Sequence, residues 1–154
     1  MPFVVLFSNP IAIAGFIAWF LAQIIKVPIE YIRTREWNWA LLMSAGGMPS
    51  SHSSLMTAVT ASIGHYHGFD SPVFILALAI AGIVIYDATG VRRQTGLQAA
   101  RINMIIKEII EHKTWPEEDI KELREVIGHS PGEALGGVIF GLVVSVIMWV
   151  LMPV

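Results

Sequence analysis

Serines and a histidine stand together at the expected start of a helix, in the stretch Pro49-Ser50-Ser51-His52. Backbone N–H groups at a helix start bind anions, and neighbouring hydroxyl groups add donors. His52 would supply a proton at the same place. This pattern indicates binding of an oxyanion such as phosphate, with Ser50 and Ser51 as donors. A serine-capped helix with an interfacial histidine explains the same residues without chemistry, and both interpretations stay open.

A second histidine precedes the expected last helix. His129 is followed by Ser130, and Glu133 lies four residues beyond the histidine. That spacing lets the carboxylate reach the imidazole and fix its tautomer. Ser130 and Glu133 also match a capping box, which needs no chemistry.

Lys26 and Arg33 supply positive charge seven residues apart. Seven residues are nearly two helical turns, so both side chains are expected on one helix face. They would bind phosphate there. Glu30 lies between them, so a surface salt-bridge ladder is the alternative.

Arg92 and Arg93 follow the expected third helix, shortly after Asp87. Two arginines at this position would fork onto a phosphate, with Asp87 as a supporting group. The alternative is a positive-inside anchor in which Asp87 pairs with one arginine.

The elements that must position these clusters are membrane helices. Charged residues form 14% of the 154-residue chain, against roughly 25% in soluble domains. Four blocks contain no Lys, Arg, Asp or Glu: 1–25, 37–69, 71–86 and 134–154. A span needs about 20 mostly apolar residues. We therefore expect a single all-α, multi-pass membrane domain over residues 1–154, with about four spanning helices.

The overall composition excludes other classes of protein. The net charge of −2 argues against nucleic-acid binding. The chain has no cysteine, which excludes disulfides, thiolate zinc sites and cysteine catalysis. We expect neither a metal nor a cofactor.

Four spans bring all four clusters to one end of the bundle. The two segments at that end hold all ten Lys and Arg, so the positive-inside rule places this end in the cytoplasm. Residues 90–128 include an amphipathic helix, expected either on the bilayer surface or packed on the bundle. Gly137 and Gly141 give a small-residue spacing that permits close helix packing, including a homodimer.

On these residues the chain resembles the divergent branch of the type 2 phosphatidic acid phosphatase superfamily, relatives of the vanadium haloperoxidases. The superfamily's first motif is Lys, six residues, then Arg-Pro. Lys26 and Arg33 match it, and Thr34 replaces the proline. The second motif is Pro-Ser-Gly-His. Residues 49–52 match it, with serine in place of glycine.

The third motif is Ser-Arg, five residues, His, three residues, Asp. His129 matches, Glu133 replaces the aspartate, and Leu123 occupies the arginine's position. Arg92 or Arg93 would have to supply that arginine from elsewhere in the chain.

The resemblance implies a metal-independent phosphatase acting on a lipid phosphate or an isoprenoid diphosphate in the membrane. It implies that His129 is the nucleophile and forms a phosphohistidine, that Glu133 orients it, and that His52 is the general acid. The phosphate ligands it implies are Lys26, Arg33, Ser50 and Ser51.

Two alternatives remain open from the sequence. A non-catalytic phosphate-headgroup binder or lipid carrier would use the same cationic pocket. A structural membrane subunit would leave both histidines merely interfacial. The phosphatase is the expectation that uses all four clusters together.

Overall fold

The structure, a computed structural model, describes residues 7–44, 46–112, 123, 125 and 127–153. Every regular element within them is a helix. These are α2 (Pro10–Thr34), the short 3-10 helix η1 (Trp39–Met43), α3 (Ser51–His67), α4 (Pro72–Thr89), α5 (Val91–His112) and α6 (Pro131–Leu151). The expected all-α membrane helix bundle is thereby confirmed.

Short polar residues set where the helices begin. The side-chain oxygen Oδ1 of Asn9 accepts a hydrogen bond from the N–H of Ile11 at 2.9 Å, and Pro10 follows at the first helical position. Ser50, Ser71 and Ser130 cap α3, α4 and α6 in the same manner. The cap residues thus fix the ends of the helices on which the candidate site depends.

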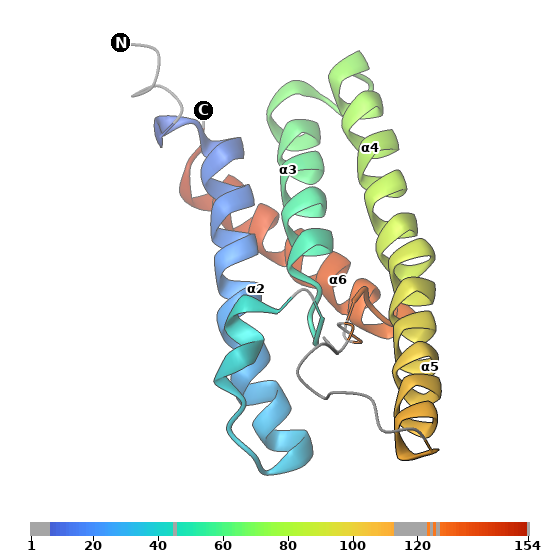
Figure 1. The fold of residues 1–154 in the computed structure, drawn as a ribbon. Helices are drawn as coiled ribbons and strands as arrows, with labels where there is room; N and C mark the ends of the chain where they lie inside the picture. The colour runs from blue at the N-terminus through green and yellow to red at the C-terminus, as the bar shows by residue number, and fades with distance from the viewer. Residues whose placement is uncertain (1–6, 45, 113–122, 124, 126, 154) are drawn as a thin grey trace.

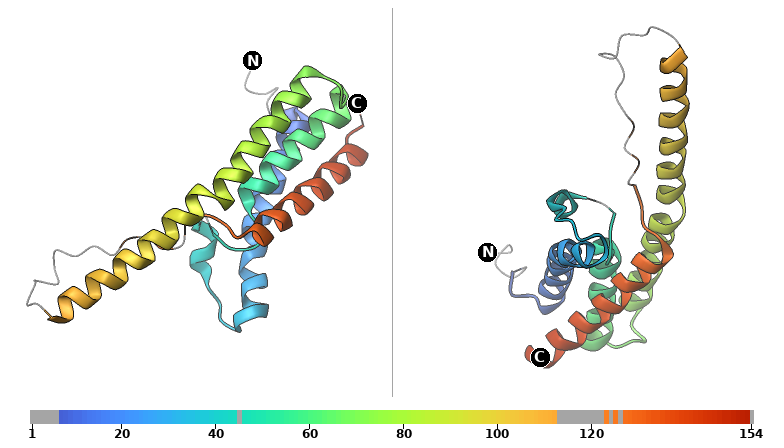
Figure 2. Two further views of the ribbon diagram at one scale, coloured as in Figure 1. Left: turned by 90° about the vertical axis from the view of Figure 1, so that its right-hand side faces the viewer. Right: turned by 90° about the horizontal axis from the view of Figure 1, so that it is seen from below.

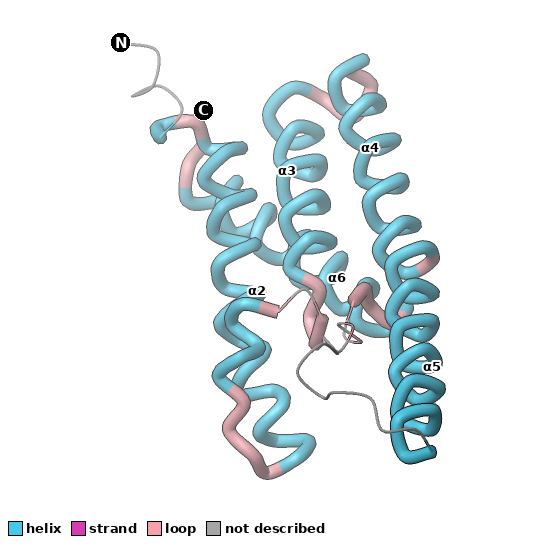
Figure 3. Tube along the Cα trace, in the orientation of Figure 1, coloured by secondary structure: helices cyan, strands magenta, loops and turns pink. Residues whose placement is uncertain are grey.

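Helix α3 lies at the centre of the bundle and packs against α2, α4 and α6 (Figure 1). The start of α2, the end of α6 and the α3–α4 turn lie at one end of the bundle. The segments before α3 and α6 lie at the other (Figure 3). The helices therefore alternate in direction, which brings the segments around His52 and His129 to the same end.

Small residues allow the close approach of α3 and α6. A Cβ atom on Gly137 would lie 2.4 Å from the carbonyl oxygen of Ser50, and one on Gly141 would lie 2.5 Å from that of Ser54. These two glycines therefore serve contacts within the chain, and their spacing gives no separate argument for a homodimer.

Among the described residues, three helices are long and apolar enough to cross a membrane: α2, α4 running on into α5, and α6. The expectation of four spans counted α3 as well. Helix α3 has only 17 residues and is rich in hydroxyl side chains. Its partners are other helices: Ser62 Oγ lies 3.0 Å from Ser145 Oγ on α6, and the Thr60 hydroxyl donates to the Ala77 carbonyl on α4 at 3.3 Å. Enclosure by its neighbours explains why α3 is more polar than a lipid-facing span.

The sequence led us to expect the amphipathic helix either on the bilayer surface or packed on the bundle, and helix α5 does not pack along the bundle. It continues the direction of α4 and projects beyond the other helices (Figure 2). The chain returning towards α6 covers one of its faces, where Gly96, Ala99 and Asn103 are buried. The apolar side chains of the predicted amphipathic pattern, such as Leu97, Ile102 and Ile105, are exposed. The returning chain therefore contacts a different face of α5, formed by small residues and Asn103.

Candidate active site

His129 lies just before α6 and is held by its backbone to the end of α4. Its N–H donates to the Ala88 carbonyl at 3.0 Å, and only 2% of its side chain is exposed. Both ring nitrogens are buried, and no described residue forms a hydrogen bond with either. Burying the Nε2 atom without a hydrogen bond costs free energy, which marks His129 as a candidate functional residue.

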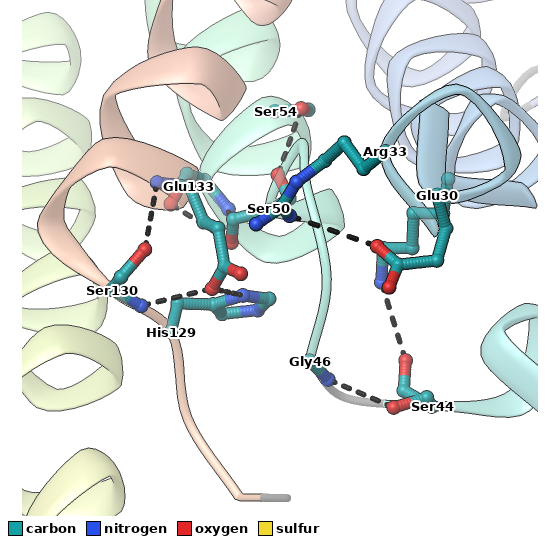
Figure 4. A network of polar contacts seen from close by, with 11 residues as sticks. Glu30, Arg33, Ser44, Gly46, Ser50, Ser54, His129, Ser130 and Glu133 are labelled. Carbon is teal, nitrogen blue, oxygen red and sulfur yellow. Dashed lines mark hydrogen bonds and ion pairs between the residues drawn. The ribbon is translucent and has the colours of Figure 1, made fainter. Parts of the chain in front are cut away.

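Glu133 serves two purposes at once, as Figure 4 shows. Its Oε2 atom accepts from the N–H of Ser130 at 2.9 Å and lies 3.4 Å from His129 Nδ1. The Ser130 hydroxyl in turn accepts from the N–H of Glu133 at 3.3 Å. The capping box and the histidine–carboxylate pair suggested by the sequence are therefore the same arrangement.

A cavity of about 180 Å³ brings both histidines together. His52 and His129 line it with Asp87, Arg92 and Gly128, and three apolar residues of α4 complete the wall. Burial is the largest influence on His52, and the positive charges of His129, Arg92 and Lys26 add to it. Together they lower the pKa of His52 below its usual value. The cavity therefore places a guanidinium beside two imidazoles, and these groups can hold an anion.

Of the two arginines after α4, the cavity includes Arg92. Its Nε donates to Oδ2 of Asp87 at 2.6 Å, and Asp87 lines the same cavity. This bond leaves the two terminal amino groups of the guanidinium available to a ligand. Arg93 is exposed and is not among the cavity residues.

Lys26 and Arg33 do not share one environment, although their spacing predicts one face. Lys26 is 1% exposed and its Nζ donates to the Ser44 carbonyl at 3.2 Å. Arg33 is largely exposed and forms an ion pair with Glu30 at 3.6 Å. The reason is position along α2: the segment after η1 covers Lys26, whereas Arg33 lies beyond it. For Arg33 the salt-bridge interpretation therefore describes the structure.

Ser50 is a cap and a link between helices. Its N–H donates to the Glu133 carbonyl at 2.9 Å, and its hydroxyl accepts from the Ser53 N–H at 3.3 Å. These bonds tie the start of α3 to the first turn of α6. The N–H groups of Ser51 and His52 have no acceptor among the described residues, so they are the donors that α3 offers to an anion.

Two residues that matter for the site had no assigned role from the sequence. Gly128 has φ +85°, and a Cβ atom there would lie 2.5 Å from the backbone nitrogen of Arg93. Asn103 binds the backbone of Leu123 with both ends of its side-chain amide. The sequence offers a signal for Gly128, because a glycine stands directly before His129. The role of Asn103 depends on a contact between residues twenty positions apart, which the sequence does not reveal.

The position of Leu123 explains the missing third-motif arginine. Leu123 is held beside Asn103 on α5. Asn103 is eleven helical residues beyond Arg92, which is roughly 16 Å along the helix at 1.5 Å per residue. A side chain at position 123 is therefore remote from the cavity that Arg92 lines. The guanidinium at this cavity comes from the α4–α5 junction.

Comparison with known proteins assigns the chain to a family. Residues 7–144 match the family described as "Divergent PAP2 family". The chain is also 38% identical over 151 residues to YuiD of Bacillus subtilis (strain 168), described as an uncharacterized membrane protein. The match covers 93% of this chain and 96% of YuiD. No solved structure matches the chain. The protein is an integral membrane protein and belongs to the divergent PAP2 family.

Proposed function

We propose that this protein is an integral-membrane phosphatase that hydrolyses a lipid phosphate or an isoprenoid diphosphate through a phosphohistidine on His129. The observation that carries the proposal is the shared cavity. His52 and His129 line it together with Arg92, and a carboxylate lies against the far side of the His129 ring. Two imidazoles beside one anion site are the groups that a two-step phosphoryl transfer needs.

In the first step, Nε2 of His129 attacks phosphorus as the bond from phosphorus to the leaving oxygen breaks. Glu133 faces Nδ1, so it favours the tautomer with the proton on Nδ1 and stabilises the charge that the ring acquires. His52, protonated, gives its proton to the leaving oxygen. In the second step, the now neutral His52 takes a proton from water, which attacks phosphorus. The bond from phosphorus to Nε2 breaks and phosphate is released.

Charge stabilisation in this mechanism comes from three sources. Arg92 reaches the phosphate directly, oriented by Asp87. Lys26 adds a buried positive charge near His52. The N–H groups of Ser51 and His52 point along the start of α3. We assign no phosphate contact to Arg33, which is exposed and ion-paired with Glu30, or to Arg93, which is exposed and outside the cavity.

The membrane supplies the substrate, and we propose that the site opens on its cytoplasmic side. Helices α2, α4 and α6 are long and apolar enough to face lipid, and α3 crosses between them inside the bundle. The candidate site lies at the end where α2 leaves the bundle and α5 begins. Within the described part of the chain, every Lys and Arg belongs to the last part of α2, to Arg35 just after it, or to α5. The positive-inside rule assigns this end to the cytoplasm.

The test is phosphate release by the protein purified in detergent, with no added metal and with a panel of lipid phosphates and isoprenoid diphosphates. We expect release that vanadate inhibits, since vanadate resembles five-coordinate phosphorus. His129→Ala and His52→Ala should each abolish most turnover. His67→Ala is the matched control, because His67 is an exposed histidine at the opposite end of α3. Wild-type turnover in both site variants would refute the mechanism.

A non-catalytic headgroup binder remains the second candidate, and the deep burial of both His129 ring nitrogens is the observation that favours it. It requires saturable binding of phosphate or vanadate to the cavity without release of phosphate from any substrate. Direct detection of released phosphate would exclude it.

A further inference from the structure

Asn103 lies on the projecting helix α5 and is 5% exposed. Its Nδ2 donates to the Leu123 carbonyl at 2.8 Å and to Glu125 Oε1 at 2.9 Å, and its Oδ1 accepts from the Leu123 N–H at 3.0 Å. One side chain therefore satisfies both backbone groups of Leu123. Moving the chain by one residue would break this pairing, so Asn103 fixes the register of the returning segment on α5.

Two turns nearer the bundle, the same face of α5 presents Gly96. A Cβ atom there would lie 2.5 Å from the Glu125 carbonyl oxygen and 2.9 Å from that of Ile127. Spacings of three and four residues place Gly96, Ala99 and Asn103 in one row. The returning segment therefore follows this row towards the cavity.

The segment ends at His129, whose N–H is bound to the Ala88 carbonyl at 3.0 Å. The chain into the cavity is thus held at two ends, by Asn103 and by Ala88. Among the described helices α5 contacts α4 alone, so Asn103 does not support the bundle around the cavity. The hydrogen bonds of its side chain to described residues all go to the segment that leads to His129.

We propose that Asn103 is a positioning residue for His129, a role that rests on the proposed phosphatase function. By holding Leu123 and Glu125 on α5, it sets where the chain enters the cavity and how the His129 ring meets the substrate. It is too far from the cavity to contact the substrate itself. An error of about 1 Å in the placement of a nucleophile lowers a rate by about 100-fold.

The experiment compares Asn103→Ala with Gln98→Ala, which removes an exposed amide from the same helix. The substrate is a short-chain lipid phosphate that the wild-type protein hydrolyses. We expect Asn103→Ala to lower kcat by about 100-fold while KM and the dissociation constant for sulfate change less than about twofold, because Arg92 and Lys26 remain in place. Gln98→Ala should keep the wild-type kcat.

A rescue pair separates positioning from stability. Asn103→Asp places a carboxylate against Glu125 and should lower kcat. Adding Glu125→Gln restores one donor–acceptor pair and should raise kcat again. A kcat for Asn103→Ala within twofold of wild type, or absence of rescue in the pair, would overturn the proposal.

One readout does not need turnover, so failure of the phosphatase assignment stays distinguishable. In protein labelled with ¹⁵N-histidine, sulfate should shift the ring signals of His129 in the wild type and in Gln98→Ala. The shift should be reduced in folded Asn103→Asp and recovered in the double variant. An unchanged His129 response in Asn103→Asp contradicts the positioning role, whatever the enzyme assay gives.

Discussion

At the residue scale, the two histidines do not depend on their neighbours in the same way. His129 is buried and fixed by its backbone and by Glu133, whereas His52 is exposed to the cavity at the first turn of α3. A fixed nucleophile beside a more accessible proton carrier is the division of roles that the proposed mechanism requires. Single substitutions at these residues therefore test the roles directly.

Glu133→Gln should separate the cap from the chemistry. Glutamine still accepts from the Ser130 N–H, so the capping box and the folding stability are retained. The negative charge beside His129 Nδ1 is lost, and kcat should fall about 100-fold. The control is Ser130→Ala, which loses about 1 kcal/mol of stability with the cap but leaves the carboxylate in place. Thermal unfolding and phosphate release measured on both variants check this. Equal kcat values for Glu133→Gln and the wild type would contradict the role of the carboxylate.

The pH dependence of anion binding should report on His52, which lies outside the three spans. Its pKa is lowered by burial and by the charges of His129, Arg92 and Lys26. A bound anion favours the protonated ring, so binding raises this pKa. The affinity for sulfate, whose charge is constant over the range, should therefore increase as pH falls below about 6.5.

Calorimetry at several pH values measures this, with His52→Gln as the control. The variant should lose the part of the pH dependence that His52 contributes, and any remainder belongs to the other titrating groups of the cavity. Parallel pH profiles for the wild type and His52→Gln would show that His52 does not face the anion.

The sequence predicted much of the residue-scale arrangement and missed part of it. The order of the helices placed His52, His129 and Glu133 at one end, and the structure has them there. The spacing correctly placed Lys26 and Arg33 on one helix, but Lys26 is buried and Arg33 is exposed. Helical periodicity says which face a residue occupies and does not say where a neighbouring segment ends.

At the element scale, the glycines decide which backbones approach. Gly128 crosses the junction of α4 and α5 so closely that a side chain would meet backbone atoms of Arg93 and Ala88. Its φ of +85° adds strain for any other residue. The path of the chain before His129 could not be predicted from the sequence, because it depends on contacts with α5 residues that are distant in sequence.

Gly128→Ala should lower both stability and activity. The strained backbone and the clash together cost about 2 kcal/mol or more, and the displaced His129 lowers kcat. Gly132→Ala is the matched control four residues away, because a Cβ atom there has no other atom within 4 Å. Thermal unfolding and phosphate release should be near wild type for Gly132→Ala. The same result for Gly128→Ala would contradict the close crossing.

At the scale of the whole molecule, orientation in the membrane decides which lipids reach the cavity. The chain has no cysteine, so single cysteines report accessibility without background. Gln98→Cys lies on α5 near the site, and Asp70→Cys lies in the turn between α3 and α4 at the opposite end. In intact cells, an impermeant thiol reagent should label Asp70→Cys and spare Gln98→Cys. The reverse pattern would place the site outside.

Composition predicted the membrane bundle as a whole, because runs of uncharged residues follow directly from the thickness of a bilayer. The count of spans was less secure for a physical reason. Helix α3 is enclosed by its neighbours and carries polar side chains that lipid would not tolerate but helix partners satisfy. Its place in the bundle depends on the packing around it.

The most direct test of the central claim is chemical trapping of the phosphorylated enzyme. The His52→Ala protein is mixed with p-nitrophenyl phosphate, whose leaving group needs no proton, and quenched in alkali, where phosphohistidine survives. Mass spectrometry of the digested protein should find one phosphoryl group on His129, because water attack is slow without His52. No phosphoryl group should be found in the double variant that also carries His129→Ala. Turnover with no phosphoryl group on His129, or with the group on another residue, would contradict the account.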